Sequence, residues 1–468
     1  MHRVLRKRHP EEGDHPQAAP HGSGIGKEKT MKYFPAATAF GTAATLAFFV
    51  PGAFLLSGPA FAAGFALRET DATSVASAYV GGVSRATDAS TVLLNPAGMS
   101  LLEYSELEGN AFYVGPSAKF SGQNYFGPGV TTPGTNGNKN ISAAATASGY
   151  GVWKINDRWA VGYGAATPYG LRMNYPENWV GRYQSLVTSI SDYELALAVS
   201  YKVTPHLVIG VGPRFGFLQG RFTETANLGA LNAYGPTNAS LAGNGFGFGY
   251  SAGAIYRFDD RTQIGITYRS RISYPVATKL KFAPPLTLSA SQPQVDALLA
   301  AESGHSKMQV TLPDSVSFGF THKLSSRWTL MMQGEWTHWS LLQSLNAVSD
   351  HGGLDTTIPV RWHNSWFGGV SASYRVLSNV TLRGGFSYDQ SPADIESRFT
   401  RAPDASRYTL GFGAEYSPIR QLTMELSFAH LFFASAPISS SSAATAGQIV
   451  GEYSNHANVV GFGIRSRF

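Results

Sequence analysis

The chain has 468 residues, a net charge of +6, 51 glycines and no cysteine, with 14% charged and 12% aromatic residues. Its mean hydropathy is −0.09. These values exclude a bundle of transmembrane helices, a disordered chain and a small disulfide-stabilised fold, which need long apolar runs, many charges or many cysteines, and they leave a glycine-rich, charge-poor β protein.

The first element in chain order has the features of an export signal. No charged residue occurs between Lys32 and Arg68, and most of the intervening residues up to position 56 are apolar. Ala60-Phe61-Ala62 provides an A-x-A cleavage sequence, which predicts that residues 31–62 are a secretory signal peptide cleaved after Ala62. A single transmembrane anchor is the alternative, but it gives the A-x-A sequence no role.

The residues before this segment are polar and show no periodicity. Met31 is followed at once by a basic residue, so we expect residues 1–30 to be an over-extended start, with a long basic n-region as the alternative. Residues 1–62 contain seven Lys or Arg and four Asp or Glu, which leaves a net charge of +3 from residue 63 onward. This small excess gives no reason to expect a nucleic-acid partner.

Residues 63–103 do not alternate as a strand would. Residues 69–79 could form a short helix, 87–90 a turn or cap, and Asn95-Pro96-Ala97-Gly98 a turn. The segment is too apolar for a disordered tail, which is the alternative, and we expect it to fold as a plug. Its apolar residues are Val75, Tyr79, Val83, Val92, Leu93, Leu94 and Met99.

From residue 104 onward apolar and polar residues alternate with a period of two, which is typical of β-strands. Many of these segments exceed the usual length of about 5–6 residues, and a tilted membrane strand needs about 9–11. Fourteen segments follow one another, at 104–120, 143–155, 158–167, 188–203, 206–223, 245–258, 261–275, 306–324, 326–340, 359–375, 378–390, 405–417, 420–433 and 455–468.

The connections between these segments are alternately tight turns and long polar loops. An even strand number with short turns at one end and long loops at the other is the signature of an outer-membrane β-barrel; a soluble β-sandwich gives no reason for it. The prediction is therefore an all-β fold, a 14-stranded antiparallel transmembrane barrel over residues 104–468. Its apolar face meets lipid, and residues 63–103 form a hatch inside a lumen too wide for side chains alone to fill.

Several motifs, in their order along the chain, resemble the FadL-type outer-membrane long-chain fatty-acid transporter family. The start Ala63-Gly64-Phe65, a small-residue helix, Asp88 and Asn95-Pro96-Ala97 are similar to the hatch of that family. The motifs that follow are TPYGLRMNY at 167–175, WVGRYQS at 179–185, LPDSVSFGF at 312–320, Trp336 with Trp339, YDQSP at 388–392 and APDASRYTLGFGAEY at 402–416. The resemblance covers residues 63–468.

The resemblance implies passive uptake of hydrophobic molecules, either long-chain fatty acids or related hydrocarbons. Cargo would be captured in an extracellular groove, pass a gating hatch and leave sideways through a kinked third strand. The implied gating residues are Asn95, Pro96, Ala97 and Gly98. The candidate kink residues are Gly162, Gly164, Pro168, Tyr169 and Gly170, although ordinary strand glycines are an equal alternative.

The third and fourth long loops, 224–244 and 276–305, supply the candidate groove, with Phe282, Leu286, Val295, Leu298, Leu299, Leu228 and Leu231. A carboxylate cargo would also need a cation in the lumen. The candidates are Arg214, Arg221, Arg361 and His363, and the alternative for them is pairing with lumen acids such as Glu194, Glu335, Asp389, Glu415 and Glu425. Whether the cargo is a fatty acid, an alkane or an aromatic stays open.

The sequence contains no H-E-x-x-H or phosphate-loop motif, and we expect no catalytic residue, metal or cofactor. The expected partners are a hydrophobic small molecule, outer-membrane lipid and lipopolysaccharide, and the barrel-assembly machinery through Phe468. We expect a monomer in the bacterial outer membrane with both mature termini in the periplasm. A general diffusion porin is the alternative, followed by a lipid-modifying enzyme barrel.

Overall fold

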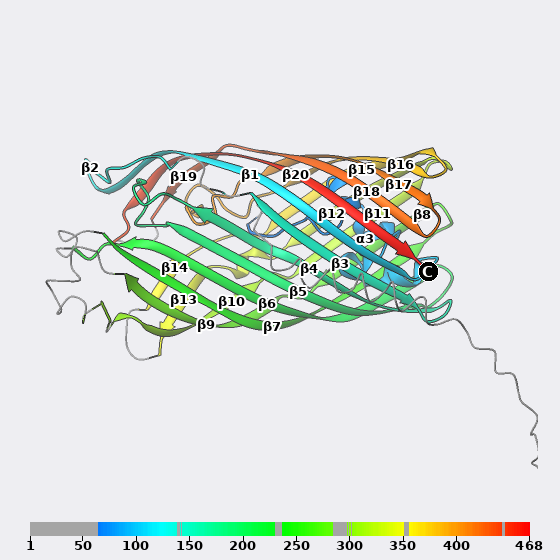
Figure 1. Cartoon of the computed structure of the whole chain (residues 1–468), viewed down its shortest axis with the longest axis horizontal. Coiled ribbons are helices and arrows are strands. Elements are labelled where there is room, and N and C mark those ends of the chain that lie inside the picture. Colours follow the sequence, from blue (N-terminus) through cyan, green and yellow to red (C-terminus); the bar gives the residue numbers. More distant parts are fainter. Residues whose placement is uncertain are drawn as a thin grey trace, which may run out of the picture.

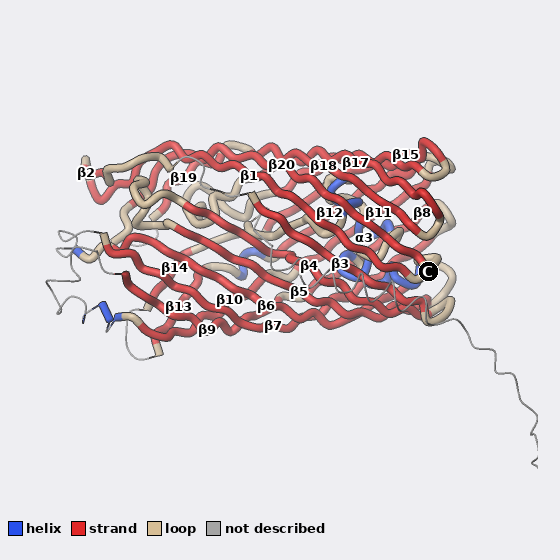
Figure 2. Tube along the Cα trace, in the orientation of Figure 1, coloured by secondary structure: helices blue, strands red, loops and turns tan. Residues whose placement is uncertain are grey.

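The computed structural model describes residues 64–137, 141, 143–229, 236–283, 297, 299–300, 302–350, 355–441 and 445–468. These residues form a long barrel of tilted strands with short helices from the N-terminal segment inside it (Figures 1 and 2). The predicted signal peptide and the residues before it lie outside the described residues, as does Ala63.

The wall consists of twenty antiparallel strand segments in one sheet. They are β1 (Glu106–Gly127), β2 (Val130–Thr131), β3 (Ala144–Lys154), β4 (Trp159–Asn174), β5 (Val187–Lys202), β6 (Leu207–Ala226), β7 (Thr237–Arg257), β8 (Thr262–Arg269), β9 (Ile272–Ala283), β10 (Gly304–Leu312), β11 (Ser315–Lys323), β12 (Trp328–Thr337), β13 (Ser344–Ser349), β14 (Thr356–Pro359), β15 (Ser365–Leu377), β16 (Val380–Asp389), β17 (Arg407–Ile419), β18 (Leu422–Phe433), β19 (Ala436–Ser440) and β20 (Gln448–Arg467).

These segments make up fourteen spanning strands, because β2 folds back on β1 and five pairs of consecutive segments each continue one strand. The pairs are β8–β9, β10–β11, β12–β13, β14–β15 and β18–β19. The barrel closes where β1 pairs with β20, from Glu106↔Arg467 to Tyr125↔Gln448. The predicted 14-stranded barrel is thus confirmed, and a closed sheet pairs the strand edges that lipid would otherwise leave without partners.

Several strands run further than the alternation predicts. β6 and β7 stay paired as far as Ala226↔Thr237, beyond the predicted ends at residues 223 and 245. Their inward residues, such as Leu218 and Leu241, pack into the apolar core of the lumen, and this burial favours pairing even where Gly, Thr and Asn resemble a loop in sequence.

The outer face of the barrel is apolar and carries aromatic pairs near the strand ends. Trp159 and Tyr201 lie with their ring centroids 4.4 Å apart, and Trp328 and Tyr374 lie 4.5 Å apart. All four rings lie at or near strand ends, as predicted from the sequence, and both pairs lie next to tight turns. Such belts place amphipathic rings at the level of the lipid headgroups.

The N-terminal segment forms a helical plug, as predicted. It contains α2 (Ala72–Ala76), α3 (Gly82–Arg85), α4 (Thr91–Leu94) and the 3₁₀ helix η2 (Pro96–Leu101), and another 3₁₀ turn, η4 (Trp339–Leu341), follows β12. The predicted helix 69–79 is shorter than expected, because Asp71 caps α2 at its start by accepting from the Ser74 amide at 2.7 Å. Among the described residues, no helix has the length and apolar character needed to cross a membrane.

Lumen-facing glycines allow the wall to approach the plug closely. A Cβ atom at Gly210 would overlap the Pro96–Ala97 backbone, and one at Gly253 would overlap the Asn95 side chain. Gly334 is different, because the nearest atom to a Cβ there would be the Phe367 carbonyl oxygen at 3.9 Å. The high glycine content therefore includes positions that the docked plug requires.

We expect Gly253→Val to displace the plug and to lower the stability of the folded barrel by about 1–3 kcal/mol, the usual cost of overpacking. Gly334→Val is the matched control, because its side chain has room on the wall. The measurement is the thermal unfolding midpoint, together with protease cleavage of the plug. Equal midpoints and equal cleavage in the two variants would contradict this expectation.

Candidate functional site

The third spanning strand, β4, has an edge that no barrel strand covers over its second half. β3 is short and pairs with β4 only from Lys154↔Ala160 to Gly149↔Ala165. It pairs with β1 only as far as Val114↔Ala144. Beyond these points the described parts of β1 and β4 face a gap in the wall.

β4 is irregular where this gap begins. The pairing with β5 shifts between Ala166↔Glu194 and Tyr169↔Asp192, so β4 carries one extra residue there. This is a β-bulge, and Pro168 within it has no amide hydrogen to donate. Of the candidate kink residues, Pro168 therefore lies within the bulge and Tyr169 directly after it.

The other candidate kink residues are placed differently. Gly162 and Gly164 lie in the regular ladder with β3 and β5. Gly162 leaves room for the plug, because a Cβ there would lie 2.8 Å from Met99 and Val92, whereas Gly164 leaves room for the Tyr150 ring on β3, which a Cβ there would meet at 2.9 Å. Gly170 lies beyond the bulge, on the uncovered edge.

The start of the described chain covers part of this edge. The Leu67 amide donates to the Pro168 carbonyl at 2.7 Å, and the Gly170 amide donates to the Phe65 carbonyl at 2.9 Å. Ala66 and Tyr169 are antiparallel bridge partners between these two hydrogen bonds. Residues 64–67, which we call the edge segment, thus pair with β4 where β3 does not reach.

Aromatic rings surround the edge segment. The Phe65 ring lies 5.9 Å from Tyr169, 5.2 Å from Trp339 and 5.8 Å from Trp362, measured between ring centroids. Gly64 has a φ of +68°, and a Cβ there would meet Trp362 at 2.8 Å and Trp339 at 2.9 Å. Only glycine fits this backbone conformation and this space without strain.

Asp404, on the loop after β16, holds the first described residue. Its carboxylate accepts from the Gly64 amide at 3.0 Å and from the Ser391 hydroxyl at 2.7 Å. Burial raises the pKa of the Asp404 carboxyl to about 6. Gly64 therefore lies in the lumen among residues of the long-loop end, whereas the C-terminus lies at the tight-turn end (Figure 1).

An apolar pocket adjoins the edge segment on the inner wall of β5–β10. Phe65 of the edge segment and Phe222 on β6 both belong to its lining. The remaining lining residues are Ile190, Leu218, Gln219, Gly220, Leu241, Gly243, Val276, Thr278, Met308, Val310 and Leu345. None of these residues is charged, so apolar groups can pack there without removing a charge from water. The cavity is small in this structure, about 40 Å³.

Three of the predicted groove residues meet at the long-loop end. Leu299 is buried and packs with Leu228 and Phe282; we call these three the outer cluster. The other predicted groove residues lie outside the described residues, namely Leu231, Leu286, Val295 and Leu298.

The four candidate cations do not line the apolar pocket. Arg214 is buried but forms a two-point ion pair with Glu194, at 2.9 and 2.5 Å. Arg221 is exposed on the face of β6 opposite to Phe222, because neighbouring strand residues point to opposite sides. Arg361 is exposed, and the half-exposed His363 lies 3.6 Å from the Asp394 carboxylate.

The Asn95–Gly98 turn lies away from the β4 bulge. The Asn95 amide nitrogen donates to Val83 O at 2.7 Å and to Ala254 O and Ile266 O, on β7 and β8, at 3.3 and 3.4 Å. The Ser200 hydroxyl donates to Ala97 O at 2.7 Å. This turn therefore fixes the plug to β5, β7 and β8, and the edge segment is what pairs with β4 at the bulge.

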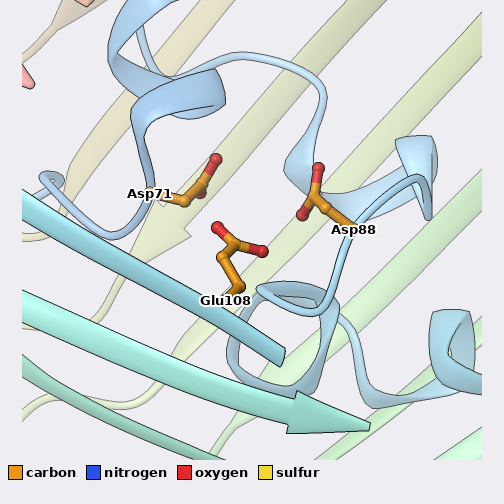
Figure 3. A group of neighbouring side chains, drawn as sticks. All are labelled: Asp71, Asp88 and Glu108. Atoms are coloured by element: carbon orange, nitrogen blue, oxygen red, sulfur yellow. The ribbon is translucent and has the colours of Figure 1, made fainter. Parts of the chain in front are cut away.

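Buried charges hold the other side of the plug. Asp71 and Asp88 from the plug and Glu108 from β1 point toward one another (Figure 3). The Arg85 Nη2 donates to Asp88 at 3.1 Å and to Asp71 at 3.3 Å. Burial alone would raise the pKa of Asp88, but the Arg85 and Arg465 guanidiniums outweigh it and hold that pKa well below its usual range.

These three carboxylates could hold a metal by their spacing, but the protein already uses them. Each of their six oxygens accepts at least one hydrogen bond, from Thr70, Ser74, Arg85, Thr87, Ser90 or Asn110. Most of these hydrogen bonds lie within the plug, and the Ser90 amide joins the plug to Glu108 of β1. Arg85 supplies positive charge to the two aspartates.

The edge segment was not predicted as a site. Its only sequence signal is the apolar pair Phe65 and Leu67 directly after the cleavage sequence, which is too short to indicate a strand. Its partner is about a hundred residues away in β4, and nothing in either segment alone identifies the other.

Comparison with known proteins agrees with this architecture. The family described as "Outer membrane protein transport protein (OMPP1/FadL/TodX)" matches residues 53–468. Outer membrane protein P1 of Haemophilus influenzae is 26% identical over 413 residues, which cover 81% of this chain and 87% of that protein. The long-chain fatty acid transport protein of Salmonella typhi is 23% identical over 395 residues, covering 81% and 89%.

Two solved structures share the fold. A FadL homologue of Pseudomonas aeruginosa superposes with a TM-score of 0.80 at 23% identity, over 87% of this chain and all of that one. The toluene transporter TodX of Pseudomonas putida superposes with a TM-score of 0.64 at 16% identity, also over 87% of this chain and all of that one.

Proposed function

Because the chain belongs to the OMPP1/FadL/TodX family of outer-membrane transport proteins, we propose that it takes up hydrophobic molecules, either long-chain fatty acids or related hydrocarbons, and releases them sideways into the membrane. The observation that carries this proposal is the gap between β1 and β4, where, among the described residues, the edge segment alone pairs with this edge of β4. Movement of this short segment would open the wall without breaking a barrel ladder.

The apolar surfaces described above form a route for such cargo. Cargo binds first to the outer cluster at the long-loop end, which we place outside the cell. It then occupies the apolar pocket and pushes against Phe65, which separates this pocket from the gap. Release through the gap keeps apolar surface out of water for the whole path.

The path straight down the lumen is unsuited to apolar cargo. The Asn95–Gly98 turn keeps the plug on the wall during release, and the space below the plug is polar. At the tight-turn end a vestibule is lined by charged side chains, including Arg85, Glu106, Arg383, Glu415 and Arg465. An apolar molecule would gain nothing by entering it.

The two ends and the outer face of the barrel meet different surroundings in the outer membrane. The tight-turn end faces the periplasm, and the barrel-assembly machinery recognises the terminal Phe468 there. Lipid and lipopolysaccharide surround the outer face, and the barrel works as a monomer, because the plug fills its lumen without a partner.

Uptake and conductance together test this function. Cells that lack the protein should lose uptake of oleate or of an aromatic hydrocarbon such as toluene, and the intact chain should restore it. The purified intact protein should conduct few ions in a planar bilayer, whereas deletion of residues 63–98 should open a large conductance, because the plug leaves the lumen. Large conductance of the intact protein would favour a diffusion porin, and uptake that never depends on the protein would refute transport.

A further inference from the structure

A row of outward-facing residues crosses the barrel wall near the long-loop end. The strand register places each member opposite the next on the neighbouring strand (Figure 1). Sequence neighbours such as Leu171, Leu241 and Leu280 are buried in the apolar core of the lumen, so the row itself points outward, because successive side chains of a strand alternate. We call it the basic row, and its members are Arg172 (β4), Ser189 (β5), Arg221 (β6), Ala242 (β7), Lys279 (β9) and His305 (β10).

The basic row concentrates positive charge that no carboxylate neutralises. Arg172, Arg221 and Lys279 are exposed, and none of the three has an ion pair with another described residue. From the row to the strand ends, the described outward positions of these six strands contain no Asp or Glu. Lys307, one outward position closer to the middle of the barrel, differs because it pairs with Asp350 at 2.9 Å.

The row lies just beyond an aromatic belt that faces lipid. Phe217 and Phe246 pack on neighbouring strands with their ring centroids 4.7 Å apart, and Phe246 is 73% exposed. Arg221 follows Phe217 by four residues on the same face, which is about 13 Å along a strand and about 10 Å along the membrane normal for a strand tilted by about 40°. The cations therefore lie above the hydrocarbon, at the depth of charged head groups.

Basic residues at the tight-turn end point the other way. Lys323 and Arg375 line the vestibule inside the barrel. The outward positions beside Arg375 are occupied instead by the aromatic pair of Trp328 and Tyr374. Outward positive charge is thus a feature of the long-loop rim, and it complements an anionic membrane surface at that end.

We propose that the basic row binds the phosphates of lipopolysaccharide in the outer leaflet, while the acyl chains of that glycolipid lie along Phe217 and Phe246. The proposal rests on the orientation given in the proposed function, with the long-loop end outside the cell. Arg221 supplies a planar guanidinium that can donate two hydrogen bonds to one phosphate, and Lys279 supplies a point charge. Strand spacing puts these two cations about 10 Å apart, with only the small Ala242 between them, so one head group can reach both.

Native mass spectrometry of the purified full-length protein tests this assignment. The protein in neutral detergent is titrated with bisphosphorylated lipid A and, separately, with dephosphorylated lipid A. We expect the combined change Arg221→Gln with Lys279→Gln to weaken binding of the phosphorylated form about tenfold or more. Dephosphorylated lipid A should bind weakly and to the same extent before and after the change.

The matched control is Lys323→Gln with Arg375→Gln, which removes the same charge from exposed residues at the tight-turn end. It should leave lipid A binding within about twofold, and heat-modified mobility in gels confirms that each variant folds. Equal weakening by the two double variants, or equal binding of the two forms of lipid A, overturns the proposal.

Two further ligands separate the glycolipid from other sources of phosphate. Displacement of lipid A by millimolar inorganic phosphate would assign the row to a free anion, and equally tight binding of dioleoylphosphatidylglycerol would assign it to any acidic lipid. Either result overturns the assignment to lipopolysaccharide. Oleate uptake is measured separately in whole cells, so a failure of transport and a failure of the basic row are distinguishable.

Discussion

A double variant, Ala66→Cys with Tyr169→Cys, should lose hydrophobic uptake when oxidised and recover it after reduction. These positions are bridge partners, and the hydrogen bonds on either side make them a non-hydrogen-bonded pair, in which Cα atoms lie about 4.5 Å apart. That spacing suits a disulfide. The bond would fix the edge segment to β4, and we expect the uptake rate to fall at least about tenfold, because release needs this segment to move.

The chain has no cysteine of its own, so the engineered disulfide would be unambiguous. Each single-cysteine variant controls for loss of the Tyr169 ring and should transport equally in both redox states. Uptake is measured with radiolabelled oleate in whole cells, with and without dithiothreitol. Full uptake in the oxidised double variant, with the disulfide verified by mass spectrometry, would refute release at this edge.

Arg85→Met should destabilise the fold of the plug. The side chain is buried, and its Nη2 contacts Asp71 and Asp88, which both belong to the plug. Removal of one partner from a buried ion pair costs about 3–5 kcal/mol, because the remaining carboxylates stay buried with less compensation. We expect a lower thermal midpoint and a rise in bilayer conductance as the plug leaves the lumen.

The control for this variant is Arg257→Met, whose partner Asp260 has a fully exposed side chain. Such surface pairs contribute only about 0–1 kcal/mol. Addition of Asp88→Asn to Arg85→Met should recover part of the lost stability, because it removes one of the uncompensated charges. Equal behaviour of the Arg85 and Arg257 variants would show that the buried cluster does not hold the plug.

Local sequence patterns identified the main parts of the molecule. Alternation of apolar and polar residues is a property of neighbouring positions, and it predicted the strands, their faces and their number. Tight turns such as the one between β3 and β4 were likewise recognisable, because they depend on a few adjacent residues. The apolar character of residues 63–103 predicted the plug for the same kind of reason.

The roles of individual residues within these parts were harder to predict. Gly162 and Gly334 both occupy a strand of the barrel, yet the first makes room for the plug and the second does not. Arg214 and Arg401 are both buried arginines, and only the position of the acids around them gives the first a two-point pair with the buried Glu194 and the second a pair with the half-exposed Glu224. These differences arise from partners that no local pattern contains.

The sequence by itself determined a charge-poor, glycine-rich barrel with a plug. Alternate residues along each strand face lipid and lumen, so the polarity of neighbouring residues records both environments. Only the tertiary structure decided where the wall is incomplete. It brings the edge segment to β4 and Arg401 to Glu224, which is 177 residues away along the chain. Strand register and lumen packing place such distant residues together, and the periodicity of a single strand carries no information about its neighbours.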